Sequence, residues 1–160
     1  MARFESAFST KMVYVYRIPD KAHEGCLKVG ETTVKCGNLW ELAPNSSILN
    51  AAAEKRIKEQ TLTAGIKAER LYTELLVYVD KKGTLKSVND GEVRNVLYRS
   101  GIKKKVFDVD GNPNEWVISD LETVKNAIKA AKEGRASLTG AEISKEKTPI
   151  SFRPEQEDAI

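Results

Sequence analysis

The stretch 14–32 constrains the fold most, because it reads as two short strands joined by a polar loop. Side chains alternate between the two faces of a strand. Tyr14 and Tyr16 therefore share one face of the first strand, and Lys28 and Gly30 share one face of the second. This pattern predicts two phenols and a long cation side by side at one sheet surface. The plainer interpretation is an amphipathic hairpin with half-buried tyrosines and a solvated lysine.

The remaining pattern predicts a small α+β domain, in which helices flank a mixed, mostly antiparallel sheet. Ser46 or Ser47 can cap the first helix, and Ser119 with Glu122 forms a capping-box pattern before the last. Residues 33–47 are expected to form a loop or a small insertion. We expect strands near 12–18, 26–29, 71–79, 85–88, 106–109 and 115–118, and helices near 47–60, 89–101 and 119–134.

Length and composition fit one soluble globular domain, since 160 residues with 41% apolar content can bury a real core. The net charge of +3 permits nucleic-acid binding but does not demand it. Cys26, Cys36 and His23 are too few for a four-ligand zinc site without carboxylates or partners. The two cysteines could pair, but we expect free thiols in a reducing compartment. The sequence has no secretory signal and no apolar run long enough to span a membrane, which predicts a cytoplasmic protein.

Two tripeptides in the hairpin, Tyr14-Val15-Tyr16 and Lys28-Val29-Gly30, resemble the paired motifs of the GIY-YIG endonucleases. The resemblance is closer to the branch found in phage reading frames and in helicase fusions, with lysine replacing the second tyrosine. A helix bearing Arg56, an acidic helix start at 90–92 and the sequence Glu115-Trp116-Val117 follow in the family's order. The resemblance covers roughly residues 12–134 and implies a nuclease domain over residues 1–134.

The resemblance implies a DNA endonuclease that hydrolyses phosphodiester bonds. Arg56 would hold the scissile phosphate, because a guanidinium offers a planar fork of donors with a permanent charge. Lys28 would stand in place of the second tyrosine and could act as a base toward the attacking water. Tyr16 would hydrogen-bond the water or the phosphate, with Tyr14 next to it.

The resemblance also implies a divalent metal, held by an acid on a helix after the third strand. Asp90 and Glu92 are the candidates, Glu115 is a third option, and Mg²⁺ or Mn²⁺ would suit a site with few protein oxygen ligands. Arg94 occupies the position four residues after Asp90, where the branch often has a histidine. Asp90 can instead be a helix N-cap, and Glu92 can simply stabilise the helix dipole. These departures leave an alternative function, a catalytically inactive DNA-binding module that positions a helicase.

A basic run follows the acidic helix start and could track the phosphate backbone of DNA. The alternative interpretation is a solvated, charged face of the domain. Its members are Arg94, Arg99, Lys103, Lys104 and Lys105.

The C-terminal stretch 135–160 is predicted to be a linker and the beginning of a second domain. Residues 135–149 are small, polar and charged, which is typical of a linker. Arg153, Pro154 and Gln156 resemble the element that precedes the phosphate loop of superfamily 2 helicases, where the glutamine reads the adenine of ATP. ATP would then bind only to a helicase-like or restriction-type ATPase domain that follows. We expect a chain ending near Gly134 to keep its stability; an ordinary amphipathic tail is the alternative.

Overall fold

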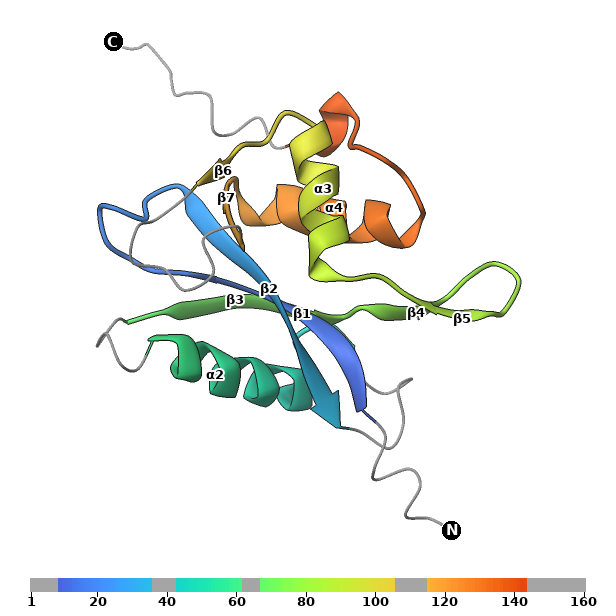
Figure 1. Ribbon diagram of the computed structural model, residues 1–160, viewed down its shortest axis with the longest axis horizontal. Helices are drawn as coiled ribbons and strands as arrows, with labels where there is room; N and C mark the ends of the chain where they lie inside the picture. The colour runs from blue at the N-terminus through green and yellow to red at the C-terminus, as the bar shows by residue number, and fades with distance from the viewer. Residues whose placement is uncertain (1–8, 36–42, 62–66, 106–114, 144–160) are drawn as a thin grey trace.

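The computed structural model describes residues 9–35, 43–61, 67–105 and 115–143 (Figure 1). One sheet has the strand order β3-β1-β2-β7-β6, and a separate hairpin pairs β4 with β5. The strands are β1 Ser9–Arg17, β2 Cys26–Lys35, β3 Glu69–Leu75, β4 Val77–Val79, β5 Leu85–Ser87, β6 Lys104–Lys105 and β7 Trp116–Ile118. The helices are α2 Ser47–Thr61, α3 Asp90–Arg99, α4 Leu121–Lys132 and the short 3-10 helix η3 Gly140–Glu142. Every pairing between described strands is antiparallel, so the predicted α+β class is confirmed.

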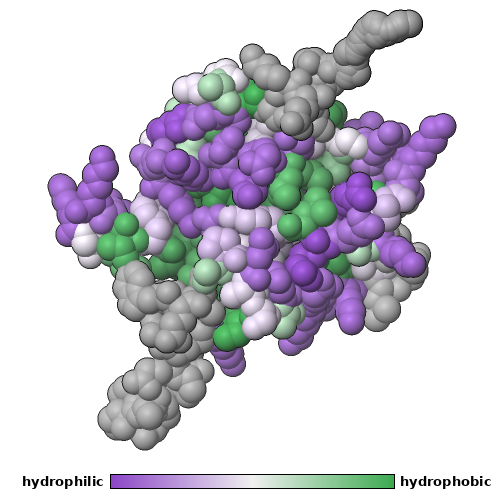
Figure 2. Space-filling model, turned by 180° about the vertical axis from the view of Figure 1, so that it is seen from behind, coloured by the Kyte–Doolittle hydropathy of each residue, from purple (hydrophilic) through white to green (hydrophobic). Residues whose placement is uncertain are grey.

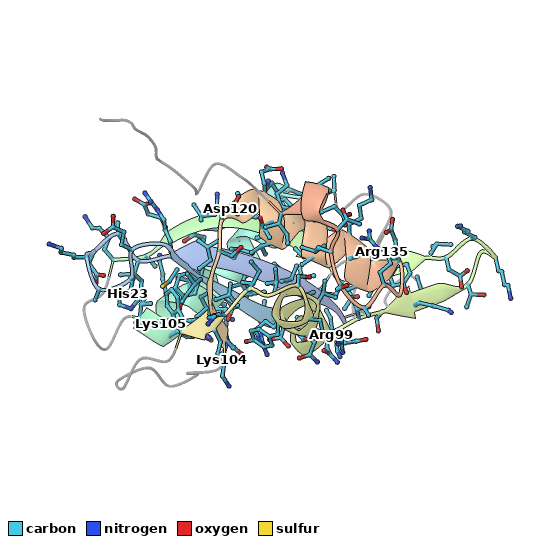
Figure 3. All side chains as sticks on the ribbon, turned by 90° about the horizontal axis from the view of Figure 1, so that it is seen from above. His23, Arg99, Lys104, Lys105, Asp120 and Arg135 are labelled. Atoms are coloured by element: carbon cyan, nitrogen blue, oxygen red, sulfur yellow. The ribbon has the colours of Figure 1, made fainter. Side chains whose placement is uncertain are left out.

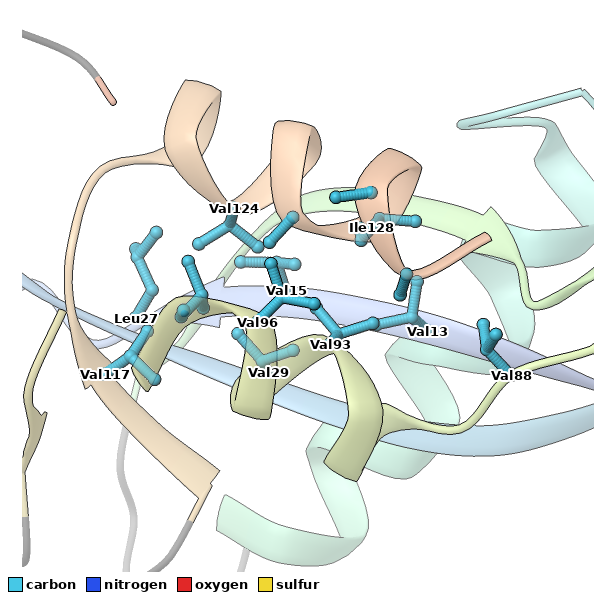
Figure 4. Close-up of a cluster of buried hydrophobic side chains, with 14 of the residues drawn as sticks. Val13, Val15, Leu27, Val29, Val88, Val93, Val96, Val117, Val124 and Ile128 are labelled. Carbon is cyan, nitrogen blue, oxygen red and sulfur yellow. The ribbon is translucent and has the colours of Figure 1, made fainter. Parts of the chain in front are cut away.

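The sheet separates two apolar layers, with α2 on one side and α3 and α4 on the other (Figure 1). Val13, Val15 and Val29 project toward α3 and α4, where they pack against Val93, Ile128 and their neighbours (Figure 4). The alternate residues of the same strands, including Tyr14 and Tyr16, belong to the layer beneath α2. Strand alternation thus sends the two tyrosines to the α2 side, as the sequence predicts.

Helix α2 covers its face of the sheet with a stripe of small and apolar side chains. Leu49, Ala53 and Ile57 are buried at intervals of four residues, which places them on one side of the helix. The Leu49 amide donates to the Ser46 hydroxyl at 3.4 Å, so Ser46 caps the helix as one of the two predicted serines. The cap and the stripe together fix which α2 side chains reach the edge of the buried face.

Three expected elements differ in the structure. The predicted strand 71–79 breaks at Leu76, because the chain leaves β1 there and continues in the separate β4–β5 hairpin. Strand β2 is longer than predicted, because residues as far as Lys35 pair with the first half of β1. The predicted Ser119–Glu122 capping box is wrong, since Asp120 occupies the N-cap. The Thr123 hydroxyl donates a hydrogen bond to the Asp120 carboxylate at 2.6 Å.

The predicted linker does not begin at residue 135, because residues 135–143 pack on the domain. Leu138 joins the core between the sheet and α4, and its amide donates to the Ser100 hydroxyl at 2.8 Å. The Asn126 side-chain amide donates to the Glu142 carbonyl at 2.9 Å. A lone leucine within a polar stretch is a weak signal in sequence, yet it anchors this segment. The expected strand 106–109 and the helicase-like stretch 152–160 lie outside the described residues.

Candidate active site

A row of three large side chains crosses neighbouring strands on the α2 side of the sheet. Tyr16 lies opposite Lys28 in the β1–β2 pairing, and Lys28 lies opposite Trp116 in the β2–β7 pairing. All three are at most 2% exposed. The Lys28 Nζ lies 5.9 Å from the Tyr16 ring centre and 6.0 Å from that of Trp116. The predicted pairing of a phenol and a cation at one sheet surface is confirmed, and Trp116 completes an aromatic surround for the amine.

Tyr14 extends this row along β1, and Gly30 makes the room for it. The Tyr14 and Tyr16 rings stack with centres 6.0 Å apart. Gly30 lies opposite Tyr14, and a Cβ at Gly30 would lie only 2.5 Å from the Tyr14 hydroxyl oxygen. The glycine of the Lys-Val-Gly motif is therefore required by the close approach of a tyrosine ring, which agrees with the expected steric role of glycine in a strand.

Helix α2 contributes Arg56 and Gln60, which lie one turn apart and reach the two phenols. The Tyr16 hydroxyl donates to the Gln60 Oε1 at 3.0 Å, and the Gln60 Nε2 donates to the Tyr14 hydroxyl at 3.0 Å. Arg56 hydrogen-bonds Tyr14 and lies 3.3 Å from the Glu59 carboxylate, with 42% of its side chain exposed. Gln60 was not predicted, although its spacing of four residues from Arg56 places it on the same side of the helix.

Glu115 places a carboxylate next to the Lys28 amine. Its Oε1 lies 3.8 Å from the Lys28 Nζ, and 20% of its side chain is exposed. Burial, reinforced by the Glu115 charge, raises the pKa of Tyr14 to about 12, although hydrogen bonds from Gln60 and Arg56 oppose the shift. Tyr14 is therefore a neutral phenol near pH 7, which suits a hydrogen-bond donor rather than a base. The described residues thus place Tyr14, Tyr16, Lys28, Arg56, Gln60 and Glu115 in one polar cluster.

A histidine at the edge of this cluster was not predicted to belong to it. The His23 ring centre lies 5.0 Å from that of Trp116, on the loop between β1 and β2. Its Nδ1 lies 2.7 Å from the Asp20 carboxylate, and hydrogen bonding to His23 lowers the pKa of Asp20. Figure 3 shows His23 at the end of the sheet toward which Lys104 and Lys105 also lie. The sequence offered no periodicity that ties a loop histidine to a distant tryptophan.

The structure does not bring the predicted metal ligands Asp90 and Glu92 to the cluster. Both lie at the start of α3, which packs on the opposite side of the sheet from α2 (Figure 1). Glu92 forms a capping box with Asn89, and Asp90 pairs with Arg94 at 2.9 Å. Asp90 is not the cap either, because that position belongs to Asn89. The two acids resemble metal ligands in sequence because the first turn of a helix favours acidic residues, which cap the helix and stabilise its dipole.

The predicted basic run does not form one surface. The Arg94 guanidinium is largely buried, donating to the Val29 carbonyl as well as to Asp90, and Arg99 donates to the Ala136 carbonyl. Lys103, Lys104 and Lys105 are exposed at the β6 edge, and Lys105 lies opposite Trp116. Figure 3 shows Lys104 and Lys105 well apart from Arg99. Only the lysines at the edge strand adjoin the candidate site.

The donor set is sparse for a metal ion. Among the described residues no group of three or more His, Cys, Asp and Glu side chains is placed to hold one. Mg²⁺ can nevertheless bind through one or two carboxylates and substrate phosphates while keeping several waters. Glu115 fits that chemistry, because its carboxylate lies in the cluster and part of it is exposed.

Comparison with protein-family models, with curated proteins and with solved structures gives no match. The resemblance to the GIY-YIG nucleases therefore stays a prediction. None of the described helices is long and apolar enough to cross a membrane.

Proposed function

We propose that this chain is a metal-dependent DNA endonuclease domain, similar in plan to the GIY-YIG nucleases, that precedes a helicase-like or restriction-type ATPase. The observation that carries the proposal is the convergence of Tyr16, Lys28 and Arg56 from two strands and a helix. These residues come from separate parts of the sequence, and the sequence pattern predicts each of them in the site. The proposed acid is Glu115 in place of Asp90 and Glu92.

The burial of Lys28 supports a functional role. An amine that is 1% exposed gives up most of its hydration, and burying a polar group costs free energy that an apolar side chain would not lose. Methionine or leucine would fill the same position between Tyr16 and Trp116 without that cost. Keeping a polar amine there, beside a carboxylate and two phenols, is typical of a chemical site.

The arrangement suggests a division of tasks. Arg56, Gln60 and Glu115 are partly exposed, so a phosphate would meet them before the buried members of the cluster. Arg56 would hold the phosphate by its fork of donors. Tyr14, held neutral by its raised pKa, would donate a hydrogen bond, and Lys28 would take the role of the base toward the attacking water that the resemblance implies. Glu115 would hold Mg²⁺ or Mn²⁺, which lowers the charge on the phosphoryl oxygens.

The alternative function, a DNA-binding module without catalysis, is also favoured by an observation. Tyr14, Tyr16 and Lys28 are all at most 2% exposed, so their polar atoms lie beneath the surface that DNA would touch. Side chains that only stabilise the fold would be buried to the same extent. Cleavage itself separates the two functions.

The test is nicking of supercoiled plasmid and branched DNA by the purified chain in magnesium or manganese. Lys28→Met, Arg56→Ala and Glu115→Gln should each reduce the rate by a factor on the order of a hundred to a thousand, since each removes one charged contact to the transition state. Arg56→Lys should also be impaired, because a point charge cannot replace the bidentate fork.

Asp90→Asn and Glu92→Gln serve as matched controls, because they change the same chemical group on the other side of the sheet. They should keep the cleavage rate and lose only stability. If the wild-type chain binds DNA but cleaves none in either metal, the nuclease proposal fails and the binding module replaces it. If Asp90→Asn abolishes cleavage while Glu115→Gln does not, the metal assignment is wrong.

A further inference from the structure

A groove of about 1030 Å³ lies between the β4–β5 hairpin and α4, on the opposite side of the sheet from the candidate active site. The hairpin contributes Lys81, Lys82 and Lys86 to its lining. Helix α4 and the turn after it contribute Lys125, Lys129, Lys132 and Arg135. Figure 2 shows mostly hydrophilic side chains, with some hydrophobic ones between them, on the side of the molecule that carries the hairpin.

Basic side chains outnumber acidic ones in the lining of this groove. Seven basic and only three acidic side chains line it, a net charge of +4, whereas the whole chain carries +3. The three acids are Glu74, Asp80 and Glu133, which pair with Lys132, Lys86 and Arg135 respectively. Those pairs neutralise three of the cations and leave four lysines in excess.

The lysines in excess stand on both walls. Among the described residues, Lys81, Lys82 and Lys129 have no acidic partner within 4.0 Å, and Lys125 has only the exposed Glu122 at 3.5 Å. Like charges that face one another across a groove repel, and an anion that lies between them relieves this repulsion. The groove therefore has the charge of a binding site for a polyanion.

The wall formed by α4 has a regular spacing of cations. Lys125, Lys129 and Lys132 follow the helical interval of four and then three residues, so they share one face of the helix. With a rise of about 1.5 Å per residue, Lys125 and Lys129 are offset by about 6 Å along the axis. The Lys125 Nζ lies 5.1 Å from the ring centre of Tyr72, which is itself 6% exposed and hydrogen-bonded to Glu74. The Tyr72 ring beneath Lys125 is therefore held in place by burial and by its hydrogen bond to Glu74.

We propose that this groove binds the phosphate backbone of a nucleic-acid strand, as a second contact surface beyond the candidate active site. Lysines are point charges that pair with phosphates without reading bases, so binding here would not depend on sequence. A protein partner fits the lining less well, because lysine is depleted at protein interfaces and their centres are apolar. The proposal does not depend on cleavage, because the groove lies on the other side of the sheet from Lys28 and Arg56.

The test is the fluorescence anisotropy of a labelled 20-base-pair duplex, titrated with the full chain in EDTA between 50 and 200 mM salt. Lys82→Gln combined with Lys129→Gln removes one exposed cation from each wall. We expect the affinity at 50 mM salt to fall by about tenfold, and the slope of log K against log salt to become shallower by about 2, since each phosphate contact contributes about 0.9. Both residues are at the surface, so the melting temperature should not change.

The matched control is Lys21→Gln combined with Lys67→Gln, which loses the same charge at the other end of the sheet. The control should keep the wild-type affinity within about twofold and keep the salt slope. Equal losses in the two variants would overturn the proposal, because they would reflect net charge alone. No binding by the wild type at 50 mM salt would also overturn it and would leave the groove to a protein partner. Because the assay contains no metal, its result is separate from the nicking test.

Discussion

Replacing Gly30 with alanine would place a methyl carbon 2.5 Å from the Tyr14 hydroxyl oxygen and 2.6 Å from the ring carbon that bears it. An ordinary contact begins near 3.4 Å, so one of the two groups has to move by about 0.9 Å. The ring cannot move easily, because Tyr14 is 1% exposed, stacks on Tyr16 and is bonded to Gln60. The β2 backbone cannot move easily either, since Gly30 is paired with β1 and the nearby Lys28 is also paired with β7.

The expected cost follows from overpacking. Forcing an extra methyl group into a close-packed interior costs about 1–3 kcal/mol. Alanine recovers roughly 0.5 kcal/mol of this, because it is less flexible than glycine in the unfolded chain and the backbone at Gly30 does not require a positive φ. We therefore expect Gly30→Ala to lower the free energy of unfolding by about 1–2 kcal/mol, measured by urea denaturation with tryptophan fluorescence.

A double-mutant cycle shows whether Tyr14 is the cause. Tyr14→Leu removes the hydroxyl and the ring atoms that the new methyl group would meet. In that background Gly30→Ala should cost nothing or stabilise slightly, which gives a coupling free energy of about 2 kcal/mol. If Gly30→Ala costs the same in both backgrounds, the steric argument is refuted, and the glycine is needed for another reason.

Two further predictions concern ionisation and the domain boundary. Because the folded state raises the pKa of Tyr14 from 10.0 to about 12, its contribution to stability is complete below pH 10 and is lost as the pH rises through 12. The melting temperature of Tyr14→Phe should therefore fall less steeply than that of the wild type between pH 10 and 12, and equal slopes would contradict the assignment. A chain ending after residue 143 should melt like the whole chain, whereas one ending after Gly134 should melt several degrees lower, because it loses roughly 1.5–3 kcal/mol from the burial of Leu138. Equal melting temperatures for the two truncated chains would show that residues 135–143 do not stabilise the domain.

Local patterns in the sequence were sufficient to predict the three α-helices and which side chains of β1 share a face of the sheet. The alternation of Tyr14, Val15 and Tyr16 predicts which side chains share a surface, because a strand has a fixed period of two. The spacing of Leu49, Ala53 and Ile57 predicts the buried side of α2, and with it the position of Arg56 at the edge. These predictions depend only on neighbours along the chain, so the sequence by itself determined them.

The membership of the candidate site was decided by the tertiary structure. In sequence Asp90 is a candidate ligand and Glu115 only a third option, but β7 pairs beside Lys28 while α3 packs on the other face. The groove between α4 and the β4–β5 hairpin is likewise invisible in sequence, since its lysines are scattered from residue 81 to residue 132. Which side of the sheet a helix covers depends on long-range packing between elements, and no local period encodes it.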